Sequence, residues 1–223
     1  MSQHGDRLAR VVLVTLLGAL WIDGLAVAQS DPWAEAMRAF EQEDRKAAPA
    51  AGGVVFVGSS SIRLWDLSRH FPNRPVINRG FGGSQIVDSV NHVSLLVTRH
   101  KPRTVIFYAG DNDIASGKTP RQVADDFKAF GGKVRAALPN TRIAFIGIKP
   151  SILRWPLISK VREANTLIRE YCDSDDALGY VDVDGPMLGW DGKPRKELFV
   201  EDGLHLSPKG YELWTVLVRP FVD

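Results

Sequence analysis

Short apolar runs recur along the chain after residue 53, and they are the clearest sign of its fold. They cover residues 54–57, 76–78, 104–108, 142–147 and 179–183. Continuous apolar runs of this length are typical of strands that are buried on both faces of a sheet. The pattern therefore predicts about five strands in one sheet.

The stretches between these runs have the spacing of helices. Apolar residues recur every three or four positions over 86–98, 123–138 and 158–171, and again after Ser207-Pro208, which favours a helix start. A further helix is expected from Asp31-Pro32, with Trp33, Met37 and Phe40 on one face. Strands and helices that alternate in this way predict an α/β fold, a three-layer parallel sheet with helices on both faces. In such sheets ligands bind beyond the carboxyl ends of the strands.

The first 28 residues have the organisation of a secretory signal peptide. Arg7 and Arg10 precede an apolar core over 11–22, and Ala26-Val27-Ala28 forms a cleavage site. The apolar core is too short to span a bilayer, which disfavours a membrane anchor. We therefore expect cleavage after Ala28, a single domain over 29–223, a periplasmic or secreted location, and no stable membrane insertion of the cleaved protein.

Charge and cysteine content narrow the range of partners. The chain has 28 Lys and Arg residues against 26 Asp and Glu residues, without a concentrated basic stripe, so nucleic acid is not an expected partner. Cys172 is the only cysteine and cannot form an intrachain disulfide. Its place in a helical pattern predicts a buried, unreactive thiol.

Two polar segments could supply a nucleophile and its base. The first predicted strand ends at Gly58, and Ser59, Ser60 and Ser61 follow, each a possible nucleophile or simply a helix cap. Near the other end of the chain, Asp202 precedes His205 by three residues across a glycine-containing turn. A carboxylate at this distance can fix the tautomer and orientation of an imidazole that acts as a general base.

Two further segments could stabilise an oxyanion. Gly80, Gly82 and Gly83 precede a predicted helix and allow a backbone N–H to approach a bound oxygen, and the Asn112 amide follows the third strand. Carboxylates beside Asn112 also raise the possibility of a metal site. However, the sequence has no HExxH motif and no paired Cys or His ligands, and His70, His92 and His100 are expected on the surface. No catalytic metal is expected.

These segments together resemble the SGNH, or GDSL-type, hydrolase family, whose four sequence blocks occur here in the family's order. The blocks are Val57-Gly58-Ser59-Ser60, the segment 78–84, Gly110-Asp111-Asn112-Asp113 and Asp202-Gly203-Leu204-His205. The resemblance implies a flavodoxin-like fold and a serine esterase without cofactor. It places the nucleophile on Ser60, the orienting acid and base on Asp202 and His205, and the oxyanion donors on Ser60, Gly83 and Asn112. The sequence departs from the family pattern at Ser59, where the family has aspartate.

The substrate is less tightly defined by the sequence. Trp65, Trp155 and Trp190 are expected in loops or near strand ends, where they would stack on a sugar or simply anchor the packing, and Lys149 and Arg154 are expected to border the pocket. We expect Trp155 and Lys149 to contact a small or glycan ester, with an O-acetyl group on a carbohydrate as the leading hypothesis. The alternatives are a thioesterase or lysophospholipase, and a non-catalytic carbohydrate-binding module on the same fold.

Overall fold

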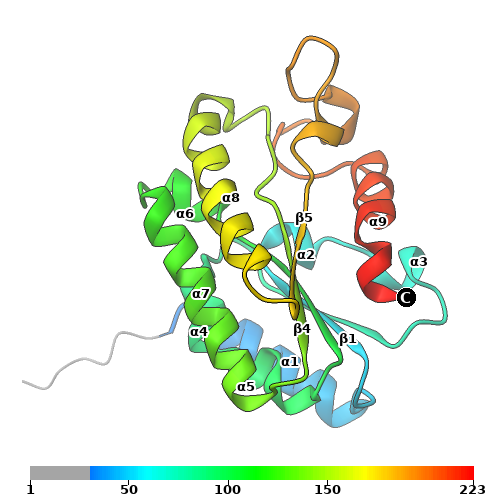
Figure 1. The fold of residues 1–223 in the computed structure, drawn as a ribbon. Helices are drawn as coiled ribbons and strands as arrows, with labels where there is room; N and C mark the ends of the chain where they lie inside the picture. Colours follow the sequence, from blue (N-terminus) through cyan, green and yellow to red (C-terminus); the bar gives the residue numbers. More distant parts are fainter. Residues whose placement is uncertain (1–30) are drawn as a thin grey trace, which may run out of the picture. The chain divides into compact units, whose positions relative to one another are not determined.

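Five parallel strands form one sheet in the computed structural model, which describes residues 31–223 (Figure 1). The expected signal peptide lies outside the described residues. The strands are β1 (Val54–Gly58), β2 (Val76–Gly80), β3 (Thr104–Tyr108), β4 (Arg142–Ile146) and β5 (Leu178–Val181). Their order in the sheet is β2-β1-β3-β4-β5, with in-register pairs such as Val55 with Ile77 and Val55 with Val105. This order is that of a flavodoxin-like sheet, so the predicted fold class is confirmed.

Helices and short 3-10 turns connect the strands. The α-helices are α1 (Ala34–Lys46), α2 (Ser60–Arg63), α3 (Leu67–His70), α4 (Ile86–Asn91), α5 (Val93–Leu96), α6 (Asp111–Ala115), α7 (Pro120–Ala137), α8 (Ile158–Asp173) and α9 (Pro208–Val222). The 3-10 turns are η1 (Thr98–His100), η2 (Trp155–Leu157), η3 (Gly185–Met187) and η4 (Lys196–Leu198). Among the described residues, every helix is too short or too polar to serve as a membrane span.

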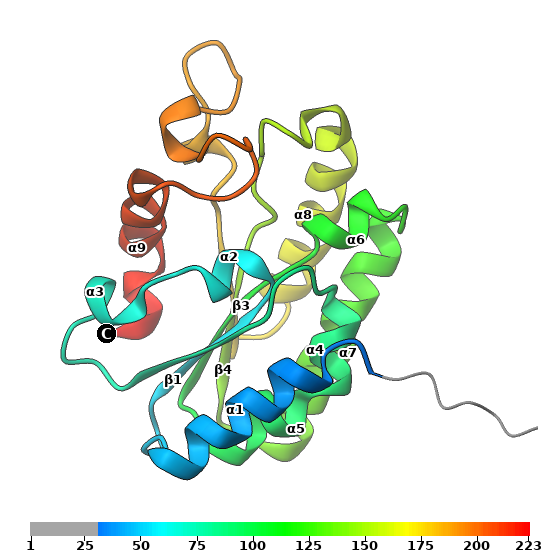
Figure 2. The same ribbon diagram turned by 180° about the vertical axis from the view of Figure 1, so that it is seen from behind.

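The helices form one layer on each face of the sheet (Figures 1 and 2). Val55 and Val57 point to the face that α1, α4, α5, α7 and α8 cover, whereas Val54 and Phe56 point to the face that α2, α3 and α9 cover. Alternate residues of a strand point to opposite faces, so a strand buried on both sides is apolar throughout. This explains why continuous apolar runs predicted the strands.

The structure changes two details of the predicted helices. The helix expected over 86–98 ends at Asn91 and resumes at Val93, because His92 leaves helical geometry (φ −105°, ψ 15°). Ile86, Val90, Leu96 and Val97 nevertheless pack into the same core, so apolar spacing alone does not reveal the break. The first helix begins at Ala34 rather than at Pro32, with Trp33 at its cap.

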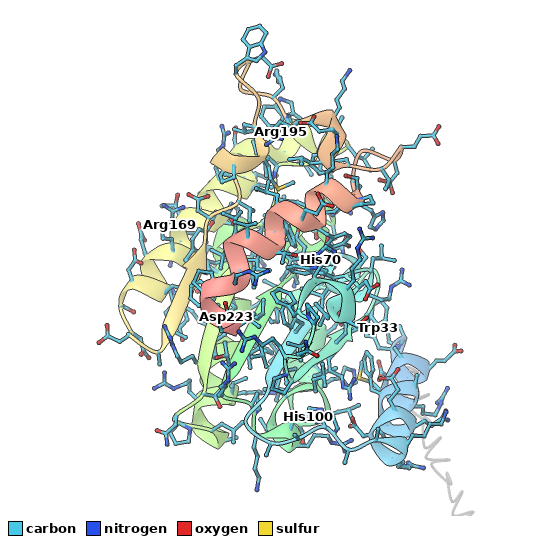
Figure 3. All side chains as sticks on the ribbon, turned by 90° about the vertical axis from the view of Figure 1, so that its right-hand side faces the viewer. Trp33, His70, His100, Arg169, Arg195 and Asp223 are labelled. Atoms are coloured by element: carbon cyan, nitrogen blue, oxygen red, sulfur yellow. The ribbon has the colours of Figure 1, made fainter. Side chains whose placement is uncertain are left out.

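Helix α1 is held to the sheet by a buried arginine. Arg79, on β2, pairs with Asp44 and, over 3.1 Å, with Glu43, and its guanidinium lies 5.0 Å from the centre of the Phe40 ring. His100 lies 3.8 Å from Asp44 and is buried, so the prediction of a surface position for His100 was wrong (Figure 3). Burial lowers the pKa of His100.

Candidate active site

The backbone conformation at Gly58, where strand β1 ends, determines where Ser60 lies. Gly58 has φ +141°, and a Cβ atom there would lie 1.8 Å from the carbonyl oxygen of Tyr108, on the neighbouring strand. Only glycine permits this close approach of β1 and β3. The N–H of Ser59 donates to the same carbonyl over 3.0 Å, and Ser60 then begins α2. The first N–H groups of a helix have no partner within the helix, so the Ser60 N–H is available to a ligand.

Helix α2 is short, but side chains from β2, from α9 and from the loop after β4 hold it. The Tyr211 hydroxyl donates to the Ser61 carbonyl (3.0 Å), and the Asn78 amide donates to the Ile62 carbonyl (2.7 Å). The Lys149 ammonium donates to the Ser61 hydroxyl (3.3 Å). Ser59 and Ser61 are completely buried, whereas Ser60 is half-buried and faces a cavity. The structure therefore distinguishes Ser60 from the other two candidate nucleophiles.

His205 lies between Ser60 and Asp202. Its Nε2 is 3.0 Å from the Ser60 Oγ, and its Nδ1 is 2.5 Å from Oδ2 of Asp202. The other carboxylate oxygen of Asp202 accepts the backbone N–H groups of Leu204 (2.8 Å) and His205 (2.9 Å). The hydrogen bond from His205 lowers the pKa of Asp202 from 3.8 to about 2. A carboxylate in this position fixes the imidazole so that Nε2 can accept the serine proton.

The turn that carries Asp202 and His205 packs against the loop after β4. Gly203 has φ +64°, and a Cβ atom there would lie 3.1 Å from the Cβ atom of Ile152. The N–H of Leu153 donates to the Gly203 carbonyl over 3.0 Å. A side chain at position 203 would therefore strain the backbone and crowd the neighbouring loop.

A cavity of about 500 Å³ opens beside the Ser60 hydroxyl. Its lining residues are Ser60, Arg63, Gly82, Gly83, Asn112, Leu204 and His205. They come from the segments that follow β1, β2 and β3 and from the turn before α9, and α2 and α6 accordingly lie at the same end of the sheet (Figure 2). The structure thus brings together the five predicted residues Ser60, Gly83, Asn112, Asp202 and His205.

The Asn112 amide has a fixed orientation at the edge of this cavity. Its Nδ2 donates to the Ser84 carbonyl over 3.0 Å, and its Oδ1 accepts a hydrogen bond from Arg154 over 2.8 Å. A primary amide nitrogen carries two hydrogens, so one remains available beyond the bond to Ser84. Gly83 adopts φ +80° and is exposed, which leaves its backbone open to the cavity.

Comparison with protein families gives a match over residues 60–213, the span that contains all of these residues, to the GDSL-like lipase/acylhydrolase family. The chain belongs to this family. It is therefore a carboxylic ester hydrolase. No curated protein matches its sequence.

Solved structures of GDSL-like and other esterases share the fold. A GDSL-like lipase from Bacteroides thetaiotaomicron has 18% sequence identity and a TM-score of 0.74, covering 83% of this chain and 96% of its own. A lipase/acylhydrolase from Enterococcus faecalis has 20% identity and a TM-score of 0.63, and the match covers 75% of this chain and 93% of its own. A carbohydrate esterase family 3 protein from Talaromyces cellulolyticus has 18% identity and a TM-score of 0.59, and the match covers 76% of this chain and 95% of its own.

A buried ion-pair network supports the Asn112 side of this GDSL-like site. Asp111 accepts a hydrogen bond from Lys149 (2.9 Å) and pairs with Arg154 (3.1 Å), which in turn donates to Asn112. Burial alone would raise the pKa of Asp111, but the two cations outweigh it and hold the pKa below its usual value. Asp111 therefore stays ionised and holds Arg154 beside Asn112.

Asp113 has a structural role in the same GDSL-like block. Its carboxylate accepts the N–H of Ile86 at the start of α4 and a hydrogen bond from Lys118 (2.9 Å). Sequence reasoning considered Asp111 and Asp113 only as metal ligands and missed both of these roles. Within residues 31–223, no group of three or more His, Cys, Asp or Glu side chains is placed to hold a metal ion.

The structure contradicts the prediction that Lys149 binds substrate directly. Lys149 is only 2% exposed, is absent from the cavity lining, and directs its ammonium at Tyr108 (2.9 Å) as well as Asp111 and Ser61. Trp155 begins the turn η2, with the Lys193 ammonium 4.9 Å from the centre of its ring, and is likewise absent from the lining. Trp65 is a packing residue that is 2% exposed, whereas Trp190 is fully exposed.

Proposed function

We propose that this GDSL-like hydrolase is an exported serine esterase that cleaves short-chain carboxylic esters through an acyl-enzyme on Ser60. The observation that carries the proposal is the position of His205, 3.0 Å from the Ser60 Oγ and 2.5 Å from Asp202. His205 accepts the serine proton as Oγ attacks the ester carbonyl carbon, and Asp202 stabilises the imidazolium that forms. His205 then passes the proton to the leaving alcohol, and water releases the acid in a second attack.

The tetrahedral intermediate carries a negative oxygen that needs donors. The backbone N–H groups of Ser60 and Gly83 and the free hydrogen of the Asn112 amide border the cavity and supply these donors. Donors that are fixed before the reaction stabilise developing charge without reorganising. The hydrogen bonds that Asn112 makes to Ser84 and Arg154 provide such fixation.

An O-acetyl group on a carbohydrate is the proposed substrate, and a periplasmic or extracellular location is proposed with it. The family supports ester hydrolysis, and the carbohydrate esterase among the similar structures supports this class of ester. The signal-peptide pattern of residues 1–28 supports export.

The test is hydrolysis of p-nitrophenyl acetate, butyrate and octanoate by the wild type and Ser60→Ala, with excess chelator present. We expect the highest kcat/KM on acetate and loss of activity in Ser60→Ala. Ser174→Ala, a change of an exposed serine after α8, is the matched control and should keep full activity. Full activity of Ser60→Ala would exclude the serine mechanism, and rates that rise beyond about eight acyl carbons would point instead to a lysophospholipase-type or thioesterase activity.

Export is tested separately. The full chain is expressed in a bacterial host, and the mass of the protein in the periplasm and medium is measured. We expect a product that begins at Gln29. An uncleaved protein in the cytoplasm would contradict the proposed location and leave the esterase chemistry unaffected.

A further inference from the structure

A second cavity lies directly beside the first. It has a volume of about 430 Å³ and is lined by Leu64, Asp66, Arg69, His70, Val200, His205, Leu206, Pro208 and Tyr211. We refer to it as the α3 groove, because several of its residues belong to α3 and the segment leading to it. Ligand pockets are commonly of this size.

The two cavities meet at His205. His205 lines both, Arg63 of the first cavity is followed by Leu64 of the groove, and Leu204 and Leu206 flank His205 on either side. The segments 63–64 and 204–206 therefore contribute to the lining of both cavities. The groove is a continuation of the active site past the imidazole, on the side that does not include Gly83 and Asn112.

The groove is lined by apolar and by polar side chains. Leu64 and Val200 are 45% and 44% exposed, so both present aliphatic surface to a ligand, and Tyr211 lies buried beneath. Among the polar lining residues, the exposed Asp66 caps α3 by accepting the N–H of Arg69 (3.1 Å). His70 lies beside α9, with its Nδ1 2.9 Å from the Thr215 hydroxyl (Figure 3).

The proposed reaction determines which half of an ester reaches the groove. The carbonyl oxygen must point at Gly83 and Asn112, while the alcohol oxygen must lie near His205 Nε2, which protonates it as the bond to the acyl carbon breaks. The group attached to the alcohol oxygen then extends past His205. We propose that the α3 groove binds the alcohol half of the ester, as a ring with an apolar face and polar edge substituents. This inference rests on the proposed serine mechanism.

The test compares two esters that differ only in the alcohol, ethyl acetate and cyclohexyl acetate, by titration of released acid. We expect the wild type to favour cyclohexyl acetate in kcat/KM by about tenfold or more, since apolar contact area is gained in the groove. Leu64→Ser and Val200→Ser should each lower this preference about threefold. Val216→Ser is the matched control, because Val216 is 67% exposed on α9 and is not part of the groove, and it should keep the preference of the wild type.

A second pair of esters, ethyl butyrate and ethyl acetate, varies only the acyl group. The groove variants should change the ratio of kcat/KM between ethyl butyrate and ethyl acetate by less than twofold. A change in the acyl preference with no change in the alcohol preference would assign the groove to the acyl chain and overturn the inference. A wild type without preference between the two alcohols, or groove variants with wild-type preference, would also overturn it. Failure of the serine mechanism is recognised separately, as undiminished hydrolysis of all these esters by Ser60→Ala.

Discussion

Arg154 donates a hydrogen bond to Oδ1 of Asn112 over 2.8 Å, and together with the bond from Nδ2 to the Ser84 carbonyl it fixes which end of the amide faces the cavity. Without the Arg154 bond, only the bond to Ser84 would oppose a turn that brings the amide oxygen toward the proposed oxyanion, where it would repel the developing charge. Arg154 is thus a positioning residue, held in turn by Asp111.

The first prediction concerns Arg154. Arg154→Lys should lower kcat about tenfold with a smaller change in KM, because one ammonium cannot reproduce the two-sided contact of a guanidinium with Asp111 and Asn112. Steady-state kinetics on p-nitrophenyl acetate measure this. Arg169→Lys, which alters an exposed arginine paired with Asp182, should behave as the wild type. A rise in KM with unchanged kcat would show instead that Arg154 binds substrate.

The second prediction concerns Asn112 itself. Asn112→Ala should lower kcat on the order of 100-fold or more, because one oxyanion donor is commonly worth about 3 kcal/mol in the transition state. A loss below tenfold would count against Asn112 as an oxyanion donor. Circular dichroism of the variant separates this effect from misfolding.

The third prediction concerns Asp202 and pH. A hydrogen bond from His205 lowers the Asp202 pKa from 3.8 to about 2, so the carboxylate stays ionised at all higher pH values. Its contribution to stability is fully present above pH 3.8 and is lost only as pH falls through about 2. A plot of log(kcat/KM) against pH should therefore rise with a slope of one on its acid side between pH 4 and 8. A slope of two would indicate that Asp202 titrates in this range.

The fourth prediction concerns the replacement of Asp202, the partner of His205. Asp202→Asn should lower kcat by about 1,000-fold or more, because the amide favours the wrong tautomer of the imidazole. The control is Asp173→Asn, at the exposed end of α8. A variant with a tenth or more of the wild-type kcat would show that His205 needs no orienting partner.

The fifth prediction concerns Lys149. Lys149→Met should reduce the free energy of unfolding by about 3 kcal/mol, because it leaves the buried Asp111 with one cation fewer. Urea unfolding measures the loss. If the variant unfolds like the wild type but shows a raised KM, Lys149 acts on the substrate and the buried role is wrong.

Most of the fold could be predicted from the sequence, for a physical reason. Strands such as 104–108 are apolar on both faces, and long helices such as α7 keep their apolar spacing, so local pattern and tertiary environment agree. The short helices α2, α3 and α6 escaped prediction because four or five residues are too few to show a period. The break at His92 escaped because the apolar spacing continues across it.

The site could be predicted only in part. The residues that meet at Ser60 are marked in sequence by glycines and by the spacing of Asp202 and His205. By contrast, the contact of Arg154 with Asn112 joins positions 42 residues apart, and nothing in either local segment signals it. Lys149 was misjudged for the same reason: a lysine in a loop is ordinarily exposed, and only the buried Asp111 explains why this one is not.

The close approach of β1 to β3 at Gly58 also bears on how this enzyme can be altered by directed evolution. A side chain at position 58 would collide with the Tyr108 backbone 1.8 Å away, and the completely buried position 59 has room only for a small side chain. The buried Ser59 hydroxyl has no hydrogen-bond partner within the described part of the chain. A saturation library across these two positions should therefore retain only glycine at 58 and admit alanine at 59. Ser60, the proposed nucleophile, thus follows two neighbours, of which the first tolerates no side chain and the second tolerates the loss of its hydroxyl but no gain in size.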